Sequence, residues 1–303
     1  MENQNRGVLL FAENNDRIDY LRLAILAANC IKNNMGAGTK VSVVTSDSSL
    51  SALARYNEKL VGLAKSLFDK IIIIDNRVEQ VDDNSRVYRD TRYHSVTAQF
   101  LNKSRSSAYY LSPYEETLLI DVDYFVLNGS LNAVWGSNED FLINKSAKTL
   151  LHKPLTGPEF RLNPFGLRMY WATVIYFKKS EKAKLIFDLV SHIKESWNYY
   201  KHVYDFPGGL YRNDFSFSIA LHMLNGFVDD EDFVKSFADP SILTATDSDQ
   251  FIGFDDKSTV RLYANDPEAT WKFYVSKVKG VNVHCLNKIS VINKFDETLE
   301  KLL

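Results

Sequence analysis

Two aspartates, Asp121 and Asp123, follow the apolar run at residues 117–120. If a strand continued through them, its period of two would point both carboxylates to the same face. Two ionised carboxylates at that spacing repel each other, and a divalent cation is the usual means of keeping both charged. The pair indicates a metal site, with an anionic group such as a diphosphate completing the metal's shell. The alternative is two solvated aspartates where a strand meets a turn.

The first half of the chain alternates between strand and helix patterns. Apolar runs at residues 8–11, 41–45 and 71–74 predict buried strands, and a strand at residues 117–121 leads into the aspartates. The spacing of apolar residues predicts helices from about residue 16 to Gly36, from 48 to about 64, and from about 93 to 103. This order predicts a parallel sheet, whose carboxyl edge is the usual place for a ligand. The first turn lacks G-x-G-x-x-G, and no P-loop motif occurs.

The second half predicts a smaller, mixed sub-region. Strands are expected at residues 141–143, 174–177 and 281–286, with a hairpin over 260–263 and 271–275. Helices are expected over 180–200, 213–224 and 293–303. Two long connections, at residues 153–166 and 205–211, are rich in glycine and proline, which is typical of functional loops. Because no linker or repeat interrupts the chain, we expect one domain over residues 1–303.

Composition excludes several classes of protein. The net charge of −2 gives no general attraction to nucleic acid. Cys30 and Cys285 lie among apolar neighbours, which favours buried thiols in a reducing compartment. No apolar run is long enough for a membrane span, and the polar residues 1–6 do not form a signal peptide. We therefore expect a cytoplasmic protein; the oligomeric state cannot be derived.

The segment from Leu111 to Asp123, L-S-P-Y-E-E-T-L-L-I-D-V-D, resembles the centre of GT-A glycosyltransferases. It is most similar to the group of glycogenin and the bacterial lipopolysaccharide galactosyltransferases, glycosyltransferase family 8. In that group a proline, an aromatic residue and an apolar strand precede the D-x-D motif. The resemblance implies a GT-A fold: an α/β fold with a mainly parallel central sheet flanked by helices and a smaller mixed C-terminal sub-region. By order of elements it covers residues 8–288.

The resemblance implies three metal ligands, Asp121, Asp123 and His284, for Mn²⁺ or Mg²⁺. Asp121 would also touch the ribose of the nucleotide. Two carboxylates and one imidazole suit Mn²⁺. Lys288 is the candidate for the family's lysine that contacts the diphosphate, although the glycine and the Pro-Trp pair that accompany it are missing here. Taken alone, His284 would be a core histidine and Lys288 a solvated lysine.

Nucleotide-binding and catalytic roles are carried over to six further residues. The first turn, with Ala12, Asn14 and Asn15, corresponds to the turn that holds uracil and ribose; the alternative is helix capping by Asn15 or Asp16. Arg92, with Arg89 in reserve, would contact sugar and phosphates, since the family places an arginine just ahead of the helix that leads to D-x-D; the alternative is a solvated basic loop. Asp214 and Asn213 resemble the helix start beside the anomeric carbon; the alternative is a helix cap.

The resemblance implies a metal-dependent hexosyltransferase that transfers a sugar from a nucleotide-diphosphate sugar, in the simplest case a UDP-sugar, to a hydroxyl group of a glycan or other acceptor. The group retains the anomeric configuration. Residues 1–127 would bind the nucleotide and residues 128–303 the acceptor, with Phe160, Phe165, Phe206 and Tyr211 lining the acceptor groove or a lid. The alternatives are a non-catalytic module that binds a nucleotide or glycan, and a haloacid-dehalogenase-type phosphatase. In that phosphatase, D-x-D follows the first strand.

Overall fold

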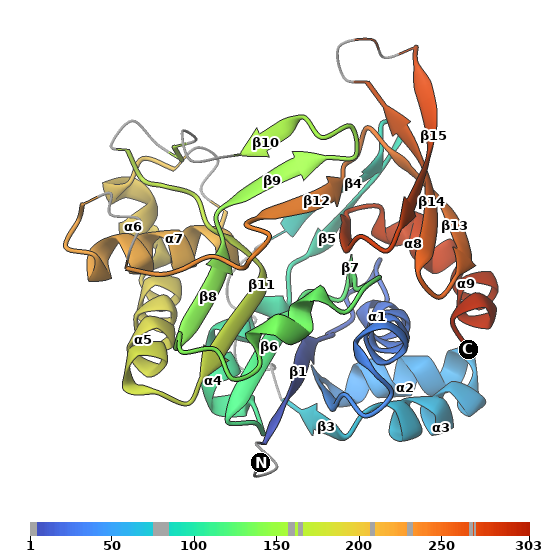
Figure 1. Ribbon diagram of the computed structural model, residues 1–303, viewed down its shortest axis with the longest axis horizontal. Helices are drawn as coiled ribbons and strands as arrows, with labels where there is room; N and C mark the ends of the chain where they lie inside the picture. Colours follow the sequence, from blue (N-terminus) through green and yellow to red (C-terminus); the bar gives the residue numbers. More distant parts are fainter. Residues whose placement is uncertain are drawn as a thin grey trace.

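The computed structural model of the protein describes residues 5–74, 85–156, 161–162, 166–206, 210–228, 233–266, 269 and 271–303. Figure 1 shows a mixed α/β fold in which helices flank a central sheet of six strands. In spatial order its strands are β3 (Lys70–Ile73), β2 (Val41–Thr45), β1 (Arg6–Phe11), β6 (Glu116–Ile120), β11 (Trp171–Lys178) and β8 (Phe141–Asn144). Strands β1, β2, β3 and β6 run parallel, whereas β11 is antiparallel to both of its neighbours. The predicted, mainly parallel central sheet is confirmed.

Helices cover both faces of this sheet. One face packs against α1 (Tyr20–Met35), α2 (Asp47–Tyr56) and α3 (Glu58–Leu67), and the other against α4 (Ala108–Leu111), α5 (Glu181–Glu195), α6 (Trp197–Val203) and α7 (Asn213–Leu224). Successive residues of β1 serve opposite faces: Val8 and Leu10 belong to the first apolar core, and Leu9 and Phe11 to the second. A strand buried on both faces reads as an unbroken apolar run, which is why β1 was found from the sequence.

A second sheet of five strands is joined to the first through the D-x-D segment. Its order is β10 (Pro154–Thr156), β9 (Ser146–Thr149), β12 (Ser241–Ala245), β16 (Val283–Cys285) and β7 (Tyr124–Phe125). Strand β12 is parallel to β9 and β16, and β7 is antiparallel to β16. A smaller mixed sheet was predicted, but of the strands expected in it only the one at residues 281–286 lies here, as β16. The strands expected at 141–143 and 174–177 are β8 and β11 of the central sheet.

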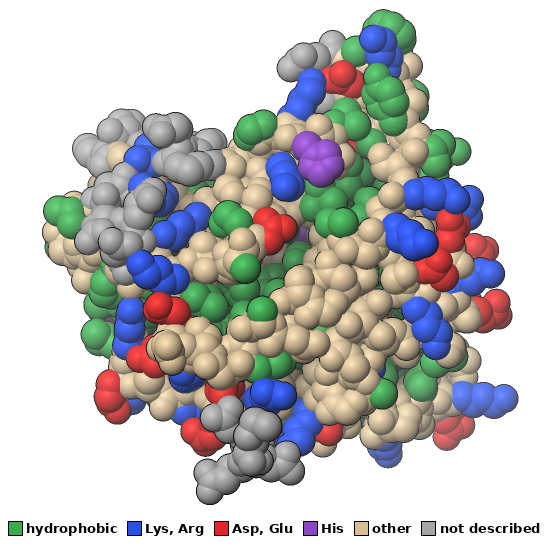
Figure 2. All heavy atoms as spheres, in the orientation of Figure 1, with side chains coloured by type: hydrophobic (Ala, Val, Ile, Leu, Met, Phe, Trp, Pro, Cys, Tyr) green, Lys and Arg blue, Asp and Glu red, His purple; other side chains and the backbone are tan. Residues whose placement is uncertain are grey.

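The remaining elements surround the edge at which the two sheets meet. They are the sheet β13 (Gln250–Asp256), β14 (Thr259–Asn265) and β15 (Phe273–Lys279), the hairpin β4 (Ser85–Thr91) and β5 (His94–Gln99), the helices α8 (Lys288–Asn293) and α9 (Phe295–Leu302), and the 3-10 helices η2 (Asn102–Ser107) and η3 (Ser130–Val134). In the view of Figure 2, acidic and basic side chains are interspersed over α2, α3 and α9. Within the described residues, no helix is both long and apolar enough to span a bilayer.

Two helix boundaries differ from the prediction because polar side chains interrupt the pattern. Helix α1 begins at Tyr20, since Asp19 is its N-cap and accepts a hydrogen bond from the amide of Arg22. The expected helix over residues 48–64 is two helices, α2 and α3. They part at Asn57, whose side chain accepts from the amide of Lys59 and caps α3.

The helix expected over residues 93–103 is wrong. Residues 94–99 form β5, which pairs antiparallel with β4, and a 3-10 helix follows at residues 102–107. The β-branched residues Val87, Val96 and Thr97 favour the hairpin, whose strands are only partly buried. An exposed hairpin has no strict apolar alternation, so its period of two was not visible in the sequence.

Candidate active site

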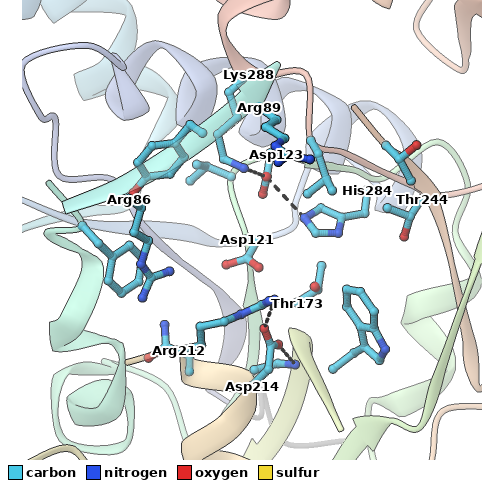
Figure 3. A pocket seen from close by; sticks show the side chains of 18 of the residues that line it. Arg86, Arg89, Asp121, Asp123, Thr173, Arg212, Asp214, Thr244, His284 and Lys288 are labelled. Carbon is cyan, nitrogen blue, oxygen red and sulfur yellow. Dashed lines mark hydrogen bonds and ion pairs between the residues drawn. The ribbon is translucent and has the colours of Figure 1, made fainter. Parts of the chain in front are cut away.

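A cavity of about 910 Å³ opens at the carboxyl ends of β1 and β6 (Figure 3). Its walls come from distant parts of the chain: the start of α1, the hairpin β4–β5, the D-x-D turn, β11, the start of α7, and the segment from β16 to α8. Asp121, Asp123, Asp214, His284 and Lys288 all line it. The sheet therefore brings most of the predicted site residues to one place.

The D-x-D segment is a turn, not a continued strand. Strand β6 ends at Ile120, and the amide of Tyr124 donates to the carbonyl oxygen of Asp121 over 3.0 Å. The chain then enters β7, where Tyr124 stands opposite His284 of β16. The two carboxylates converge because the chain reverses between them. From their spacing we expected them on one face of a continuing strand, and that explanation is wrong. The reversal also explains how a residue near the C-terminus comes to lie beside Asp123.

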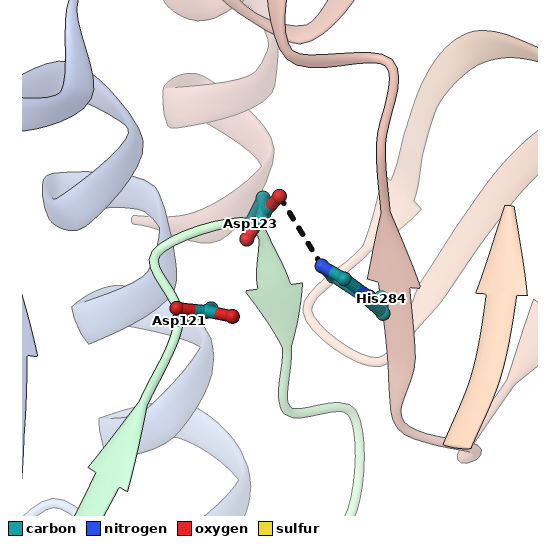
Figure 4. Close-up of side chains that lie close together, drawn as sticks. All are labelled: Asp121, Asp123 and His284. Atoms are coloured by element: carbon teal, nitrogen blue, oxygen red, sulfur yellow. Dashed lines mark ion pairs between the residues drawn. The ribbon is translucent and has the colours of Figure 1, made fainter. Parts of the chain in front are cut away.

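Asp121, Asp123 and His284 form a compact cluster (Figure 4). One carboxylate oxygen of each aspartate and one ring nitrogen of His284 all lie within 4.8 Å of one another. His284 Nε2 is 3.3 Å from Asp123 Oδ2, and both side chains are buried, whereas the Asp121 side chain is 36% exposed. The cluster thus has two buried members and one that opens to the cavity.

Each carboxylate also pairs with a basic side chain. Lys288 Nζ contacts Asp123 Oδ2, and Arg105 Nη1 contacts Asp121 Oδ1. Burial acts to raise the pKa of Asp123, but the charges and hydrogen bonds of Lys288 and His284 outweigh it and hold this pKa well below its usual range. Burial lowers the pKa of Arg105 to about 10, so this guanidinium is still charged at neutral pH.

The donor set fits a divalent cation. Two carboxylates and one imidazole nitrogen are ligands that Mn²⁺ accepts, and Mg²⁺ shares the preference for carboxylates. Among the described residues, His284 Nδ1 is buried without a hydrogen-bond partner, whereas Nε2 faces Asp123. A cation at the cluster would take over the charge compensation that Lys288 and Arg105 provide.

Helix α7 presents Asp214 to the same cavity. Asp214 Oδ1 accepts from the amide of Ala172 over 2.9 Å, and Oδ2 accepts from Arg212 Nη2 over 2.9 Å. Asn213, beside it, accepts from the hydroxyl of Tyr211 over 3.0 Å. Both predicted residues line the cavity at the start of the helix, as expected. The carboxylate of Asp214 is oriented through both of its oxygens.

The predicted nucleotide turn is placed differently from our expectation. Ala12, Asn14 and Asn15 are not among the residues that line the cavity, whereas Ile18 and Tyr20 are. The Asn14 side chain accepts from the amide of Leu21 and donates to Asp19, and Ala12 is fully buried. Asn15 accepts from the amides of residues 17 and 18 and donates to the carbonyl of Gln99. Both side-chain amides thus have partners in the protein. The N-cap of α1 is Asp19, so the alternative of capping by Asn15 or Asp16 is wrong, and nucleotide binding by the turn stays a prediction.

The arginine predicted to contact the sugar and phosphates also lies elsewhere than expected. Arg92 lies in the exposed turn of the hairpin and does not line the cavity, whereas Arg86, the reserve candidate Arg89, and Arg105 do. Arg105 was missed, although it precedes α4 and β6 and so occupies the place where the resemblance puts an arginine. The false helix over residues 93–103 moved our choice ahead of it.

The aromatic residues expected in an acceptor groove are only partly described. Phe160 and Phe165 lie outside the described residues. Phe206 and Tyr211 are buried and each packs against Trp197, with ring centroids 5.6 Å apart in both cases. Neither of them lines the cavity. These two residues stabilise the core beneath α7, so the groove assigned to them is wrong at both positions.

No protein-family model matches the sequence, and no curated protein matches it. Solved structures similar to this chain include the galactosyltransferase LgtC in complex with donor and acceptor sugar analogues, at 13% identity and a TM-score of 0.44, over 98% of this chain and 95% of LgtC. Others are the glycosyltransferase GlyE of Streptococcus pneumoniae, at 11% identity and a TM-score of 0.42, over 78% of this chain and 46% of GlyE, and mouse xyloside xylosyltransferase 1, at 13% identity and a TM-score of 0.41, over 71% and 80%. The chain spans just under half the length of GlyE.

Proposed function

We propose that this chain is a metal-dependent glycosyltransferase that moves a sugar from a nucleotide-diphosphate sugar to an acceptor hydroxyl group. The observation that supports it most is the cluster of Asp121, Asp123 and His284, which the reversal after β6 assembles at the mouth of a large cavity. The sequence resemblance names the same three residues as ligands in a glycosyltransferase. UDP as the nucleotide and retention of anomeric configuration belong to the proposal through that resemblance.

Asp121, Asp123 and His284 would hold the divalent cation, which supplies charge stabilisation for the leaving diphosphate when bound. Lys288 and Arg105 are the residues of this chain that would bind the phosphate oxygens, because each is freed when its aspartate becomes a ligand. Preorganised cations aimed at developing negative charge are among the largest contributions to catalysis. Lys288 and Arg105 would therefore neutralise the two aspartates before the metal and substrate bind, and the phosphate oxygens afterwards.

Asp214 is proposed to stabilise positive charge at the anomeric carbon. Its two oxygens already accept hydrogen bonds from Ala172 and Arg212, which fixes the carboxylate and reduces its strength as a nucleophile. An oriented, ionised carboxylate can still stabilise an oxocarbenium-like centre electrostatically. Asn213 would support the same position from the adjacent start of α7.

The position of the D-x-D motif in the strand order favours this function over the phosphatase. Asp121 follows β6, which lies next to β1 in the sheet but comes fourth among its parallel strands along the chain. The phosphatase mechanism places its aspartates after the first strand of the chain. The cavity is lined both by residues of the first half of the chain, 1–127, and by residues of the second half, 128–303. This supports our assignment of the nucleotide to the first half and of the acceptor to the second.

The decisive experiment measures release of the nucleotide from UDP-sugars, with Mn²⁺ and with EDTA, for the wild type and Asp123→Ala. We expect Mn²⁺-dependent turnover that falls at least about a hundredfold in the variant, because one missing stabilising group costs that much. Asp188→Asn, in an exposed ion pair with Lys184, is the control and should keep full turnover. Metal-dependent turnover that survives in Asp123→Ala refutes the site. UDP binding without any turnover would indicate the non-catalytic module.

A further inference from the structure

Charges in the wall of the cavity are paired, with one exception among the described residues. The pairs are Arg105 with Asp121, Lys288 with Asp123, Arg212 with Asp214 and Arg89 with Asp247. Arg86 of β4 lines the same cavity, and within the described part of the chain it has neither an ion pair nor a side-chain hydrogen bond. A guanidinium that is partly withdrawn from water without an acid partner carries an uncompensated desolvation cost.

The unpaired atoms of Arg86 define the shape of the missing partner. Nε and Nη2 are both buried and both lack an acceptor. These two N–H groups form one edge of the guanidinium, where they lie parallel and match the two oxygens of a carboxylate. The guanidinium carbon lies 3.6 Å from the centre of the Phe100 ring, which restricts the plane of the fork.

The position of Arg86 separates it from the proposed diphosphate site. In Figure 3, Arg86 lies on the side of the cavity that holds Arg212 and Asp214, across from His284. Burial lowers the pKa of Arg86 to about 10, so its guanidinium remains charged at neutral pH. Asp214 makes no ion pair with Arg86, because its Oδ2 pairs with Arg212 instead. Arg86 therefore leaves an unpaired positive charge at this end of the cavity.

We propose that Arg86 binds a carboxylate of the sugar substrate, so that the sugar at this end of the cavity is a uronic acid. The carboxylate belongs either to the transferred sugar or to the acceptor, and both sources require the same bidentate contact. The inference deepens the proposed function and rests on it for the reaction. Binding of the acid group can be measured without turnover.

The test is isothermal titration calorimetry in two arms, with Arg86→Gln and a matched control. The donor arm compares UDP-glucuronate and UDP-galacturonate with UDP-glucose and UDP-galactose, in the presence of Mn²⁺. The acceptor arm compares the methyl glycosides of the same four sugars, with and without UDP and Mn²⁺. Arg92→Gln is the control, because it removes an exposed cation of the same hairpin that does not line the cavity. Thermal unfolding of each variant verifies the fold.

We expect the wild type to bind an acid sugar of one arm at least about tenfold more tightly than its neutral counterpart, as a charge-assisted bidentate contact allows. Arg86→Gln should abolish this preference, Arg86→Lys should reduce it, and Arg92→Gln should keep it. The arm that shows the preference identifies the source of the carboxylate. Equal binding of acid and neutral sugars in both arms overturns the inference. If UDP still binds in that case, the proposed function is preserved. If UDP does not bind, the function fails, and the acceptor arm without UDP still decides on Arg86.

Discussion

A divalent cation and Lys288 would compete for the same carboxylate. Asp123 Oδ2 is contacted by Lys288 Nζ and lies 3.3 Å from His284 Nε2. The low pKa of Asp123 that these neighbours produce means that the carboxylate is ionised at every ordinary assay pH. The competition gives Lys288 a role that can be separated from that of the ligands.

Lys288→Gln should raise the affinity for Mn²⁺ and lower turnover. The variant removes the competing ammonium group, so Mn²⁺ should bind several-fold more tightly, whereas loss of a cation at the leaving group should cost about a hundredfold in kcat. Calorimetry with Mn²⁺ alone and steady-state kinetics measure the two effects separately. Weaker Mn²⁺ binding in the variant would contradict the competition, and unchanged kcat would remove Lys288 from the catalytic machinery.

Site residues could be predicted from the sequence where a motif lies at the carboxyl edge of the predicted sheet. The closeness of Asp121 and Asp123 followed from the motif at the carboxyl edge of a parallel sheet, whereas His284 was predicted only through the family resemblance. Arg105 could not be chosen without knowing that η2 and α4, rather than a longer helix, lead to β6. Asn14 lies outside the cavity wall for a different reason: its amide accepts from the backbone of Leu21 and donates to the side chain of Asp19, which no residue type reveals.

The hairpin β4–β5 is attached to the start of α8 through one buried carboxylate. Asp90 Oδ1 accepts from the amides of Ile289 and Ser290, over 2.8 and 3.1 Å, and Oδ2 accepts from the hydroxyl of Ser290. Because Lys288 is the first residue of α8, this attachment also positions its side chain. The hairpin therefore contributes to the site both directly, through Arg86, and indirectly, through α8.

Asp90→Ala should destabilise the protein and weaken donor binding together. Two buried amides lose their acceptor, which should lower the free energy of unfolding by about 2–3 kcal/mol. Chemical denaturation measures this loss, and KM for the donor should rise because Lys288 is no longer held. Ser290→Ala removes only the hydroxyl contact and should cost about 1 kcal/mol. A stability equal to that of the wild type would show that water replaces the carboxylate.

Strand β1 depends on a glycine for its fit against the segment before β6. A Cβ atom at Gly7 would lie 2.5 Å from Cζ of Tyr114, whose hydroxyl is fixed by Ser42 over 2.6 Å. Gly7→Ala should therefore lower the free energy of unfolding by about 1–3 kcal/mol through overpacking. Gly62→Ala, at an exposed position of α3 with no atom within 4 Å of the new methyl group, should stabilise by about 0.5–1 kcal/mol. Thermal unfolding compares the two, and equal effects would contradict the close packing.

Elements were predictable to the extent that burial imposes a pattern. The parallel strands β1, β2 and β6 are buried along nearly their whole length, so they read as apolar runs. The exposed hairpin gave no such signal, and its strand β5 was mistaken for a helix. The antiparallel entry of β11 between β6 and β8 is set by long-range pairing, which local spacing does not encode.

At the scale of the whole molecule, the cavity connects the two halves of the chain. The D-x-D turn belongs to the first half, whereas His284, Lys288 and Asp214 belong to the second, and all of them line one space. A ligand that contacts both walls binds the folded chain only, because the unfolded chain has no such arrangement. Its binding energy should therefore appear in full as stability of the folded chain.

The nucleotide and the cation should stabilise the protein together more than either alone. At a hundred times its dissociation constant, a ligand adds about 2.7 kcal/mol to the free energy of unfolding, which corresponds to a rise in Tm of roughly 4 °C for a chain of this size. A thermal-shift panel of UDP, GDP, ADP and CDP, with Mn²⁺ or with EDTA, measures the rise and identifies the base. We expect the largest rise in Tm for UDP with Mn²⁺. In Asp123→Asn, adding Mn²⁺ should not increase the rise that UDP alone produces. A shift of the same size in EDTA would show that the nucleotide binds without the cluster of Asp121, Asp123 and His284, and the metal-dependent mechanism would then have to be abandoned.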